Sequence, residues 1–172
     1  MAGRPADRAL SATGFTPSHR GGSGAPLVLI HGFMDTWRIW ELVLPALQRD
    51  HDVLALTLAG HAGGPPLPEP ATEAALLDAL EQAMDDAGWP LAHVAGNSLG
   101  GYLALKLAER GRASTVTAVA PAGGWAQGDT SYRELFSLQL DIQRSVATTA
   151  APGRSVPCHP VGQTGCHAVH GH

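Results

Sequence analysis

The chain has 172 residues, of which 44% are hydrophobic and 15% charged, a composition typical of one globular domain. Its 11 basic and 15 acidic residues give a net charge of -4, with no Lys/Arg cluster long enough to follow a phosphate backbone, so no nucleic acid is expected as a partner. The apolar runs are far shorter than the roughly 20 residues of a membrane-spanning helix, and the start lacks a secretory signal. We therefore expect no membrane association and a cytoplasmic location.

The first part of the chain is expected to form a loose arm, a strand and a helix. Residues 1–25 are rich in Gly, Ser, Pro and Arg, which predicts an N-terminal arm with at most a short edge strand near 12–16. The apolar run 27–30 ends at a glycine turn, which is typical of a strand buried on both faces. Apolar residues at helical spacing then predict a helix over 37–47, which Pro45 disturbs.

Strands and helices alternate over the middle of the chain. Short apolar runs bounded by turn residues predict three further strands, over 52–58, 91–95 and 115–120. Between them lie a helix that Thr72 caps and Gly88 ends, and a second helix over 99–109. This alternation predicts a doubly wound, mostly parallel α/β sheet over 26–130, with helices on both faces and ligands beyond the C-terminal ends of its strands.

The end of the chain does not continue this pattern. Residues 131–149 predict the start of one more helix, and no strand follows it. From residue 150 there is no acidic residue, so 150–172 is expected to be an aberrant, disordered tail produced by truncation or by a shifted reading frame. Its possible zinc ligands fit no regular spacing, so neither a metal nor a cofactor is expected: they are Cys158, His159, Cys166, His167, His170 and His172.

A Gly-x-Ser-x-Gly pattern at residues 96–100 is the first candidate for chemistry. The composition gives about 0.13 such matches by chance, so the pattern alone is weak. Its position is informative, because Gly96 and Gly100 permit a tight turn between strand and helix that projects the Ser98 hydroxyl above the sheet. The turn also puts the backbone N–H of Leu99 at a helix N-terminus, where it can stabilise an oxyanion.

A second glycine turn ends the first clear strand. In the sequence His31-Gly32-Phe33, the turn can aim the backbone N–H of Phe33 at the same oxyanion. His31 is expected to play a structural role in this loop through hydrogen bonds, and His61 and His93 to be turn and core-edge residues. Nearby aromatic residues favour an apolar acyl site: they are Phe33, Trp37 and Trp40.

Together these segments resemble the α/β-hydrolase superfamily over residues 25–145. The resemblance rests on residues 29–33, on Leu58-Ala59-Gly60-His61 and on the Gly-Asn-Ser-Leu-Gly-Gly run at 96–101. It implies an esterase- or lipase-like serine hydrolase in which Ser98 attacks an ester, thioester or related small-molecule acyl substrate. The dehalogenase and epoxide-hydrolase branches place Asp at this position instead. The implied supporting residues are Phe33 and Leu99 as oxyanion donors, His31, Gly32, Gly96, Asn97 and Gly100 in the two turns, and 131–149 as the start of a cap.

The family's acid and histidine, which follow the serine in that order, have no match here. None of the later acids follows a further predicted strand; they are Glu109, Asp129, Glu134 and Asp141. Two hypotheses therefore stay open: an active acyl hydrolase, or a non-catalytic remnant that keeps an oxyanion site but lacks the base. In both, the sheet ends after its fourth clear strand, and we expect self-association through the exposed edge.

Overall fold

The computed structural model describes residues 16–68, 71–124 and 128–130. The chain divides into two units, Met1–Trp125 and Ala126–His172, and all the described helices and strands lie in the first. The predicted cap helix over 131–149 and the predicted tail over 150–172 fall outside the described residues. Within the part of the chain that is described, no helix is both long and apolar enough to cross a membrane.

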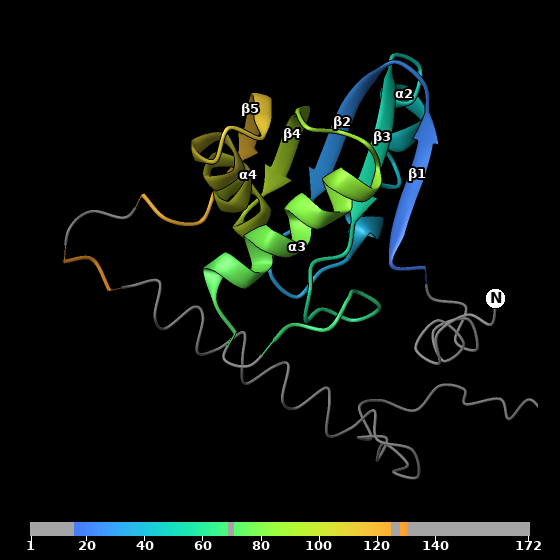
Figure 1. Cartoon of the computed structure of the whole chain (residues 1–172). Helices are drawn as coiled ribbons and strands as arrows, with labels where there is room; N and C mark the ends of the chain where they lie inside the picture. Colours follow the sequence, from blue (N-terminus) through green and yellow to red (C-terminus); the bar gives the residue numbers. More distant parts are fainter. Residues whose placement is uncertain (1–15, 69–70, 125–127, 131–172) are drawn as a thin grey trace, which may run out of the picture. The chain divides into compact units, whose positions relative to one another are not determined.

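The sheet has five strands in the order β1-β3-β2-β4-β5, as Figure 1 shows. Its four parallel strands are β2 (Ala25–Ile30), β3 (His51–Leu56), β4 (Ala92–Asn97) and β5 (Ala113–Val119). They confirm the predicted mostly parallel α/β sheet, with strand ends that differ from the predicted ones by at most two residues. β5 pairs with β4, and on its other side it pairs with no described residue, so it forms one edge of the described sheet.

The other edge strand, β1 (Ser18–Gly22), lies inside the segment predicted as a loose arm, and there that prediction was wrong. β1 pairs antiparallel with β3, with Ser18 opposite Leu56 and Gly22 opposite Asp52. The glycines that indicated a loop instead permit close packing: a Cβ on Gly22, whose φ is +87°, would lie 2.2 Å from the carbonyl oxygen of His51. Of the short edge strand predicted near 12–16, residues 12–15 lie outside the described ranges, and Thr16 is not in a strand.

The prediction of a single helix over 37–47 was also wrong. The segment forms a 3-10 helix, η1 (Trp37–Trp40), and a one-turn helix, α2 (Leu44–Leu47), with Pro45 in the first turn of α2. Proline has no N–H to donate to the carbonyl four residues earlier, so it disfavours the interior of a helix and suits the first turn of a new one. The apolar residues still serve the core, because Trp37 and Leu44 are both buried.

The two longer helices match their sequence signals. α3 (Glu73–Asp86) begins after Thr72, whose hydroxyl accepts a hydrogen bond from the N–H of Ala75 at 3.1 Å. Gly88, at φ +78°, follows its end, as predicted for a left-handed stop. α4 (Leu99–Glu109) has the predicted bounds. Capping and periodicity are local properties, and this explains why both helices could be predicted from sequence.

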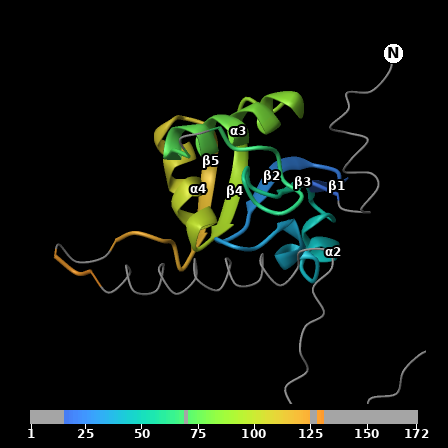
Figure 2. The same ribbon diagram turned by 90° about the horizontal axis from the view of Figure 1, so that it is seen from below.

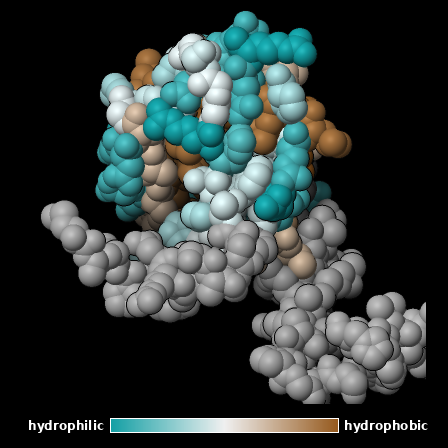
Figure 3. All heavy atoms as spheres, turned by 90° about the vertical axis from the view of Figure 1, so that its right-hand side faces the viewer, coloured by the Kyte–Doolittle hydropathy of each residue, from teal (hydrophilic) through white to brown (hydrophobic). Residues whose placement is uncertain are grey.

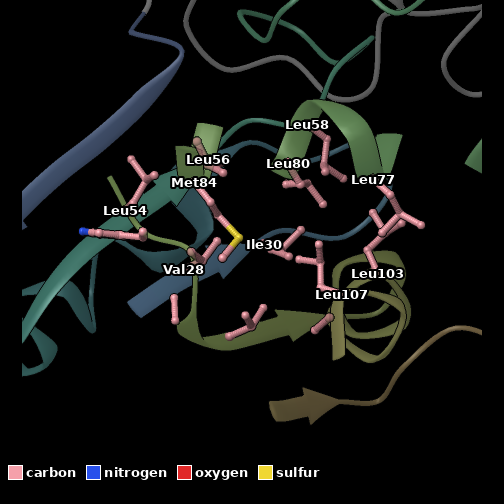
Figure 4. Close-up of a cluster of buried hydrophobic side chains, with 14 residues drawn as sticks. Val28, Ile30, Leu54, Leu56, Leu58, Leu77, Leu80, Met84, Leu103 and Leu107 are labelled. Atoms are coloured by element: carbon pink, nitrogen blue, oxygen red, sulfur yellow. The ribbon is translucent and has the colours of Figure 1, made fainter. Parts of the chain in front are cut away.

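Helices lie on both faces of the sheet, as predicted. Figure 2 shows α3 and α4 on one side of the strands and α2 on the other. Between the sheet and α3 and α4, side chains of both layers point toward one another in the main core (Figure 4). It includes Val28, Ile30, Leu54, Leu56, Leu58, Leu77, Leu80, Met84, Val94, Leu103 and Leu107. A smaller second core under η1 and α2 consists of Leu27, Leu29, Trp37, Leu44, Val53 and Ala55.

The register of β2 and β4 places the candidate site. These strands are neighbours and run parallel, and Ile30 at the end of β2 lies opposite Gly96 near the end of β4. The segments that follow, His31 onward and Asn97 onward, therefore leave the sheet side by side. In a doubly wound sheet this is the end at which ligands bind.

Candidate active site

Ser98 occupies the sharp turn between β4 and α4. Its backbone has φ 53° and ψ -115°, a conformation with positive φ that residues other than glycine rarely adopt. Hydrogen bonds hold it there: its N–H donates to the carbonyl of Val119 at 3.0 Å, and its carbonyl accepts from the N–H groups of Tyr102 and Ala122 at 3.1 and 2.9 Å. Its side chain makes no capping hydrogen bond to α4, so the hydroxyl is not committed to the helix end.

The glycines around Ser98 let three backbone segments pack without side chains between them. A Cβ on Gly96 would lie 2.1 Å from the carbonyl oxygen of Gly100, and one on Gly100 would lie 2.2 Å from the carbonyl oxygen of Ile30. Real Cβ atoms do not approach backbone this closely, so alanine at either position would push α4 away from β2 or β4. The tightness of the turn therefore depends on both glycines.

Gly32 brings the end of β2 against the same turn. A Cβ built on Gly32 would lie 3.0 Å from Oδ1 of Asn97 and 3.3 Å from Cβ of Ser98. The structure thus places the two predicted glycine turns in direct contact, at the C-terminal ends of adjacent parallel strands. A larger residue at position 32 would occupy space beside the Ser98 side chain.

His31 is buried and ties the ends of β2 and β3 together. Its Nε2 accepts a hydrogen bond from the N–H of Leu58 at 2.8 Å, and its Nδ1 lies 2.6 Å from the carbonyl oxygen of Gly32. A neutral imidazole has one donor and one acceptor, so these partners require the proton on Nδ1. Burial lowers the pKa of His31, which favours that neutral form. The contacts match the structural role expected for this residue.

The carbonyl of Gly32 fixes the orientation of the following peptide. It accepts from Nδ1 of His31 and from the N–H of Asp35, at 2.6 and 3.3 Å. Because the peptide group is planar and trans, the N–H of Phe33 points opposite to that carbonyl. Met34 completes the turn with φ +67°, a left-handed conformation that an unbranched side chain adopts only at some cost.

His61, expected only to be a turn residue, also contacts this loop. Its ring packs edge-on against His31 and Phe33, with ring centroids 5.0 and 5.9 Å away. Its Nδ1 lies 3.3 Å from the carbonyl oxygen of Ala59, and its buried Nε2 has no hydrogen-bond partner among the described residues. Burial lowers the pKa of His61. Only the Leu-Ala-Gly-His turn at 58–61 could have suggested this position.

A cavity of about 240 Å³ opens beside Leu99, the residue after Ser98. Its walls come from the loop after β3 and from the first turns of α3 and α4; among them are Leu67, Glu73, Leu76, Tyr102 and Leu103. The walls are mainly apolar, apart from the Tyr102 hydroxyl, which donates a hydrogen bond to the Glu73 carboxylate. No sequence pattern indicated this cavity, because the segments that form its walls are far apart in the chain.

Other candidate residues lie away from the turn. Trp37 and Trp40 belong to the second core under η1 and α2, so the expectation that they line the apolar site was wrong. Their spacing suits a helix that covers the sheet, and their apolar rings pack against the sheet in that position. His93 lies on β4, where its Nδ1 is 2.7 Å from the Thr115 hydroxyl. Glu109, the first acid after Ser98, ends α4 in an ion pair with Lys106 at 2.8 Å.

Most of the other acids and histidines that follow Ser98 in the sequence cannot be placed relative to it. Glu134, Asp141 and all the histidines of the tail lie outside the described residues. Within the described part of the chain, no group of three or more His, Cys, Asp or Glu side chains is placed to hold a metal ion.

Known proteins share this sequence and fold. One relative, the epoxide hydrolase EphH of Mycobacterium tuberculosis, is 50% identical over 56 residues, which are 33% of this chain and 26% of the relative. Another, a pimeloyl-[acyl-carrier protein] methyl ester esterase of Legionella pneumophila, is 32% identical over 87 residues, 51% of this chain and 33% of the relative. A solved structure of a meta-cleavage product hydrolase from Pseudomonas fluorescens IP01 aligns with a TM-score of 0.58 and 28% identity, over 75% of this chain and 54% of that one.

These matches span only part of each relative: between about a quarter and about half of its length. A protein-family match covers more of this chain. The family described as alpha/beta hydrolase fold matches residues 25–157, which is more than half of the sequence. The matched region contains the whole parallel sheet, the turn at Ser98 and the loop at His31. The chain belongs to the alpha/beta hydrolase fold family.

Proposed function

We propose that the chain carries the nucleophile and oxyanion site of a serine hydrolase that acts on an ester, thioester or related acyl substrate. The observation that carries this proposal is the conformation of Ser98. A serine held at φ 53° on a tight turn, with no capping bond from its hydroxyl, is costly for the fold and suits a nucleophile that projects above the sheet. In the proposed reaction the Ser98 oxygen attacks the substrate carbonyl carbon, the bond from that carbon to the alcohol oxygen or thiol sulfur breaks, and the hydroxyl proton leaves with the alcohol or thiol. Water then hydrolyses the acyl-enzyme to the free acid and Ser98.

The proposed oxyanion donors are the backbone N–H groups of Phe33 and Leu99. Leu99 begins α4, so its N–H is among those that have no partner inside the helix, and the helix dipole favours negative charge there. The carbonyl of Gly32 is held by two donors, and this fixes the direction of the Phe33 N–H. The contact between Gly32 and Ser98 supports a shared position for the oxyanion.

The cavity beside Leu99 supports an apolar acyl group as the substrate. Apolar side chains form most of its walls, and a volume of about 240 Å³ suits a small acyl or leaving group rather than a long lipid chain. The Legionella relative is named as an esterase, which agrees with acyl chemistry. The Mycobacterium relative is named as an epoxide hydrolase, but this chain has Ser at the position where that branch of the family places Asp.

The test is covalent labelling of the whole 172-residue chain with a fluorophosphonate probe. We expect labelling that Ser98→Ala abolishes and that Ser114→Ala, a change at an exposed serine of β5, leaves intact. An assay with p-nitrophenyl acetate should show a burst of nitrophenol from the parent and none from Ser98→Ala. Absence of labelling in a folded parent chain would overturn the proposal in favour of the inactive, binding-only alternative. Hydrolysis of styrene oxide that survives Ser98→Ala would favour epoxide chemistry at another residue.

A further inference from the structure

Aromatic rings join the loop after β2 to the turn after β3. The ring of His61 packs edge-on against both Phe33 and His31, with interplanar angles of 89° and 70°. Contacts on the side that carries β1 are of another kind: hydrophilic side chains cover much of it (Figure 3), and the ion pair of Arg20 with Asp52 is partly exposed. An exposed ion pair contributes little to holding a structure, whereas aromatic rings pack in preferred orientations. The turn after β3 is therefore placed to hold the loop of the candidate site.

The turn that carries His61 is itself held by hydrogen bonds. The N–H of His61 donates to the carbonyl of Leu58 at 3.1 Å, and its carbonyl accepts from the N–H of Gly64 at 2.9 Å. The Nδ1 atom of its ring lies 3.3 Å from the carbonyl oxygen of Ala59, so backbone and ring are bound to the same turn. A Cβ on Gly64 would lie 2.3 Å from the carbonyl oxygen of Leu58, so the turn is closely packed. The ring of His61 thus projects from a well-fixed support.

The two rings that His61 contacts belong to the residues on either side of Gly32. His31 binds the carbonyl of Gly32 through Nδ1, and Phe33 supplies the N–H of the same peptide group, which is the proposed oxyanion donor. The backbone on both sides of Phe33 gives it little support, because Gly32 has no side chain and Met34 is strained at φ +67°. The position of this N–H therefore depends on the contacts of the rings at positions 31 and 33.

We propose that His61 is a positioning residue for the oxyanion site, a proposal that rests on the proposed function of Ser98. Its ring braces the phenyl group of Phe33 and the imidazole of His31, and so keeps the N–H of Phe33 where the oxyanion forms. In this role His61 acts through Phe33 and does not touch the substrate. A displacement of about 1 Å in a site of this kind can slow a reaction by about a hundredfold, so loss of the brace should be visible in the rate.

The test compares variants of the full chain by their rates of fluorophosphonate labelling. Rates over a series of probe concentrations give kinact, the rate constant of the chemical step, and KI, the probe concentration at half the maximal rate. His61→Ala removes the ring, and kinact should fall about tenfold or more while KI stays within about threefold, because the oxyanion donor acts on the reacting group. His61→Phe keeps a ring in place and should retain kinact within about threefold of the parent.

The control is His51→Ala, which also removes an edge-on ring contact. The ring centroids of His51 and His93 are 5.9 Å apart, the same separation as between His61 and Phe33. His51 begins β3, at the opposite end of the parallel strands from Ser98, so labelling should keep the parent's kinact and KI. Circular dichroism of every variant checks the fold, and His61→Gln, which also lacks the ring, replaces His61→Ala if that variant does not fold.

Relaxation dispersion of the isotope-labelled Phe33 amide measures the brace without any reaction. It should show exchange on the microsecond-to-millisecond timescale in His61→Ala, and none in the parent or in His61→Phe. A parental kinact in His61→Ala, equal losses in His61→Ala and His61→Phe, or an amide that stays rigid in His61→Ala would each overturn the proposal. If the parent is not labelled, the proposed function fails, and the amide measurement alone decides whether His61 holds Phe33.

Discussion

At the ends of β2 and β4 backbone lies directly against backbone, whereas β5 contacts the described sheet along one side only. Around Ser98 there is no room for a methyl group on Gly96 or Gly100, and a buried histidine joins neighbouring strand ends. Along β5, four of the seven residues are exposed. The backbone is therefore held on several sides where chemistry is proposed, whereas along β5 the described residues leave one side of the strand unpaired.

The largest expected effect on the free energy of unfolding is that of Gly100→Ala, in the tight turn around Ser98. The new methyl group would overlap the carbonyl oxygens of Ile30 and His31, at 2.2 and 2.6 Å, so α4 and β2 must move apart. We expect a loss of about 3 kcal/mol or more in the free energy of unfolding, measured in urea by circular dichroism. Gly111→Ala is the control: φ is +74° there but nothing lies within 4 Å of the added Cβ, so about 1 kcal/mol is expected. Equal losses would contradict the packing described here.

His31→Ala should have the next largest effect. It removes the acceptor of the buried Leu58 N–H and one of the two donors to the Gly32 carbonyl, and it leaves a cavity. We expect a loss of about 2 to 4 kcal/mol in the free energy of unfolding. The control is His51→Ala, which loses a partly buried contact to Leu47 at 3.3 Å and an edge-on ring contact with His93, and for which less than about 1 kcal/mol is expected. If the chain is a hydrolase, His31→Ala should also slow labelling of Ser98.

Acid should lower the free energy of unfolding through the two buried histidines near Ser98, His31 and His61. Burial lowers the pKa of His31 and His61 in the folded chain, so below the unfolded pKa of about 6.5 the unfolded chain binds more protons. The contribution of these groups to stability is therefore complete above pH 6.5 and is lost as the pH falls toward their folded pKa values. Urea titrations at pH 8 and pH 5.5 should show this loss, and His61→Gln should reduce it. A stability that does not change over this interval would argue against buried neutral histidines.

The smallest effect on the free energy of unfolding is expected for Thr117→Ala, on the edge strand β5. Thr117 is an exposed residue of β5, so its truncation should change the free energy of unfolding of the monomer by less than about 0.5 kcal/mol. The matched change on the neighbouring strand is Val94→Ala, whose side chain is 1% exposed in the main core and whose loss should cost about 2 kcal/mol. Similar values for the two would mean that β5 is covered.

The sequence predicted what is encoded locally. The cap at Thr72, the stop at Gly88 and the glycine-flanked turn at Ser98 are short patterns, and each lies where it was expected. β1 could not be predicted, because its position depends on pairing with β3, whose residues follow 30 to 38 positions later, and its glycines also suit a loop. The cavity beside Leu99 and the contact of His61 with Phe33 depend in the same way on segments that meet only in the folded chain.

The positive φ of Ser98 lowers the stability of the folded chain, and this affects which residue selection would favour at position 98. Glycine reaches φ 53° without steric cost, so a chain under pressure for stability alone would drift toward glycine at this position. A hydroxyl-bearing side chain there is a standing penalty that every folded molecule carries. Replacing Ser98 by glycine would therefore remove the proposed nucleophile and raise the free energy of unfolding in a single substitution.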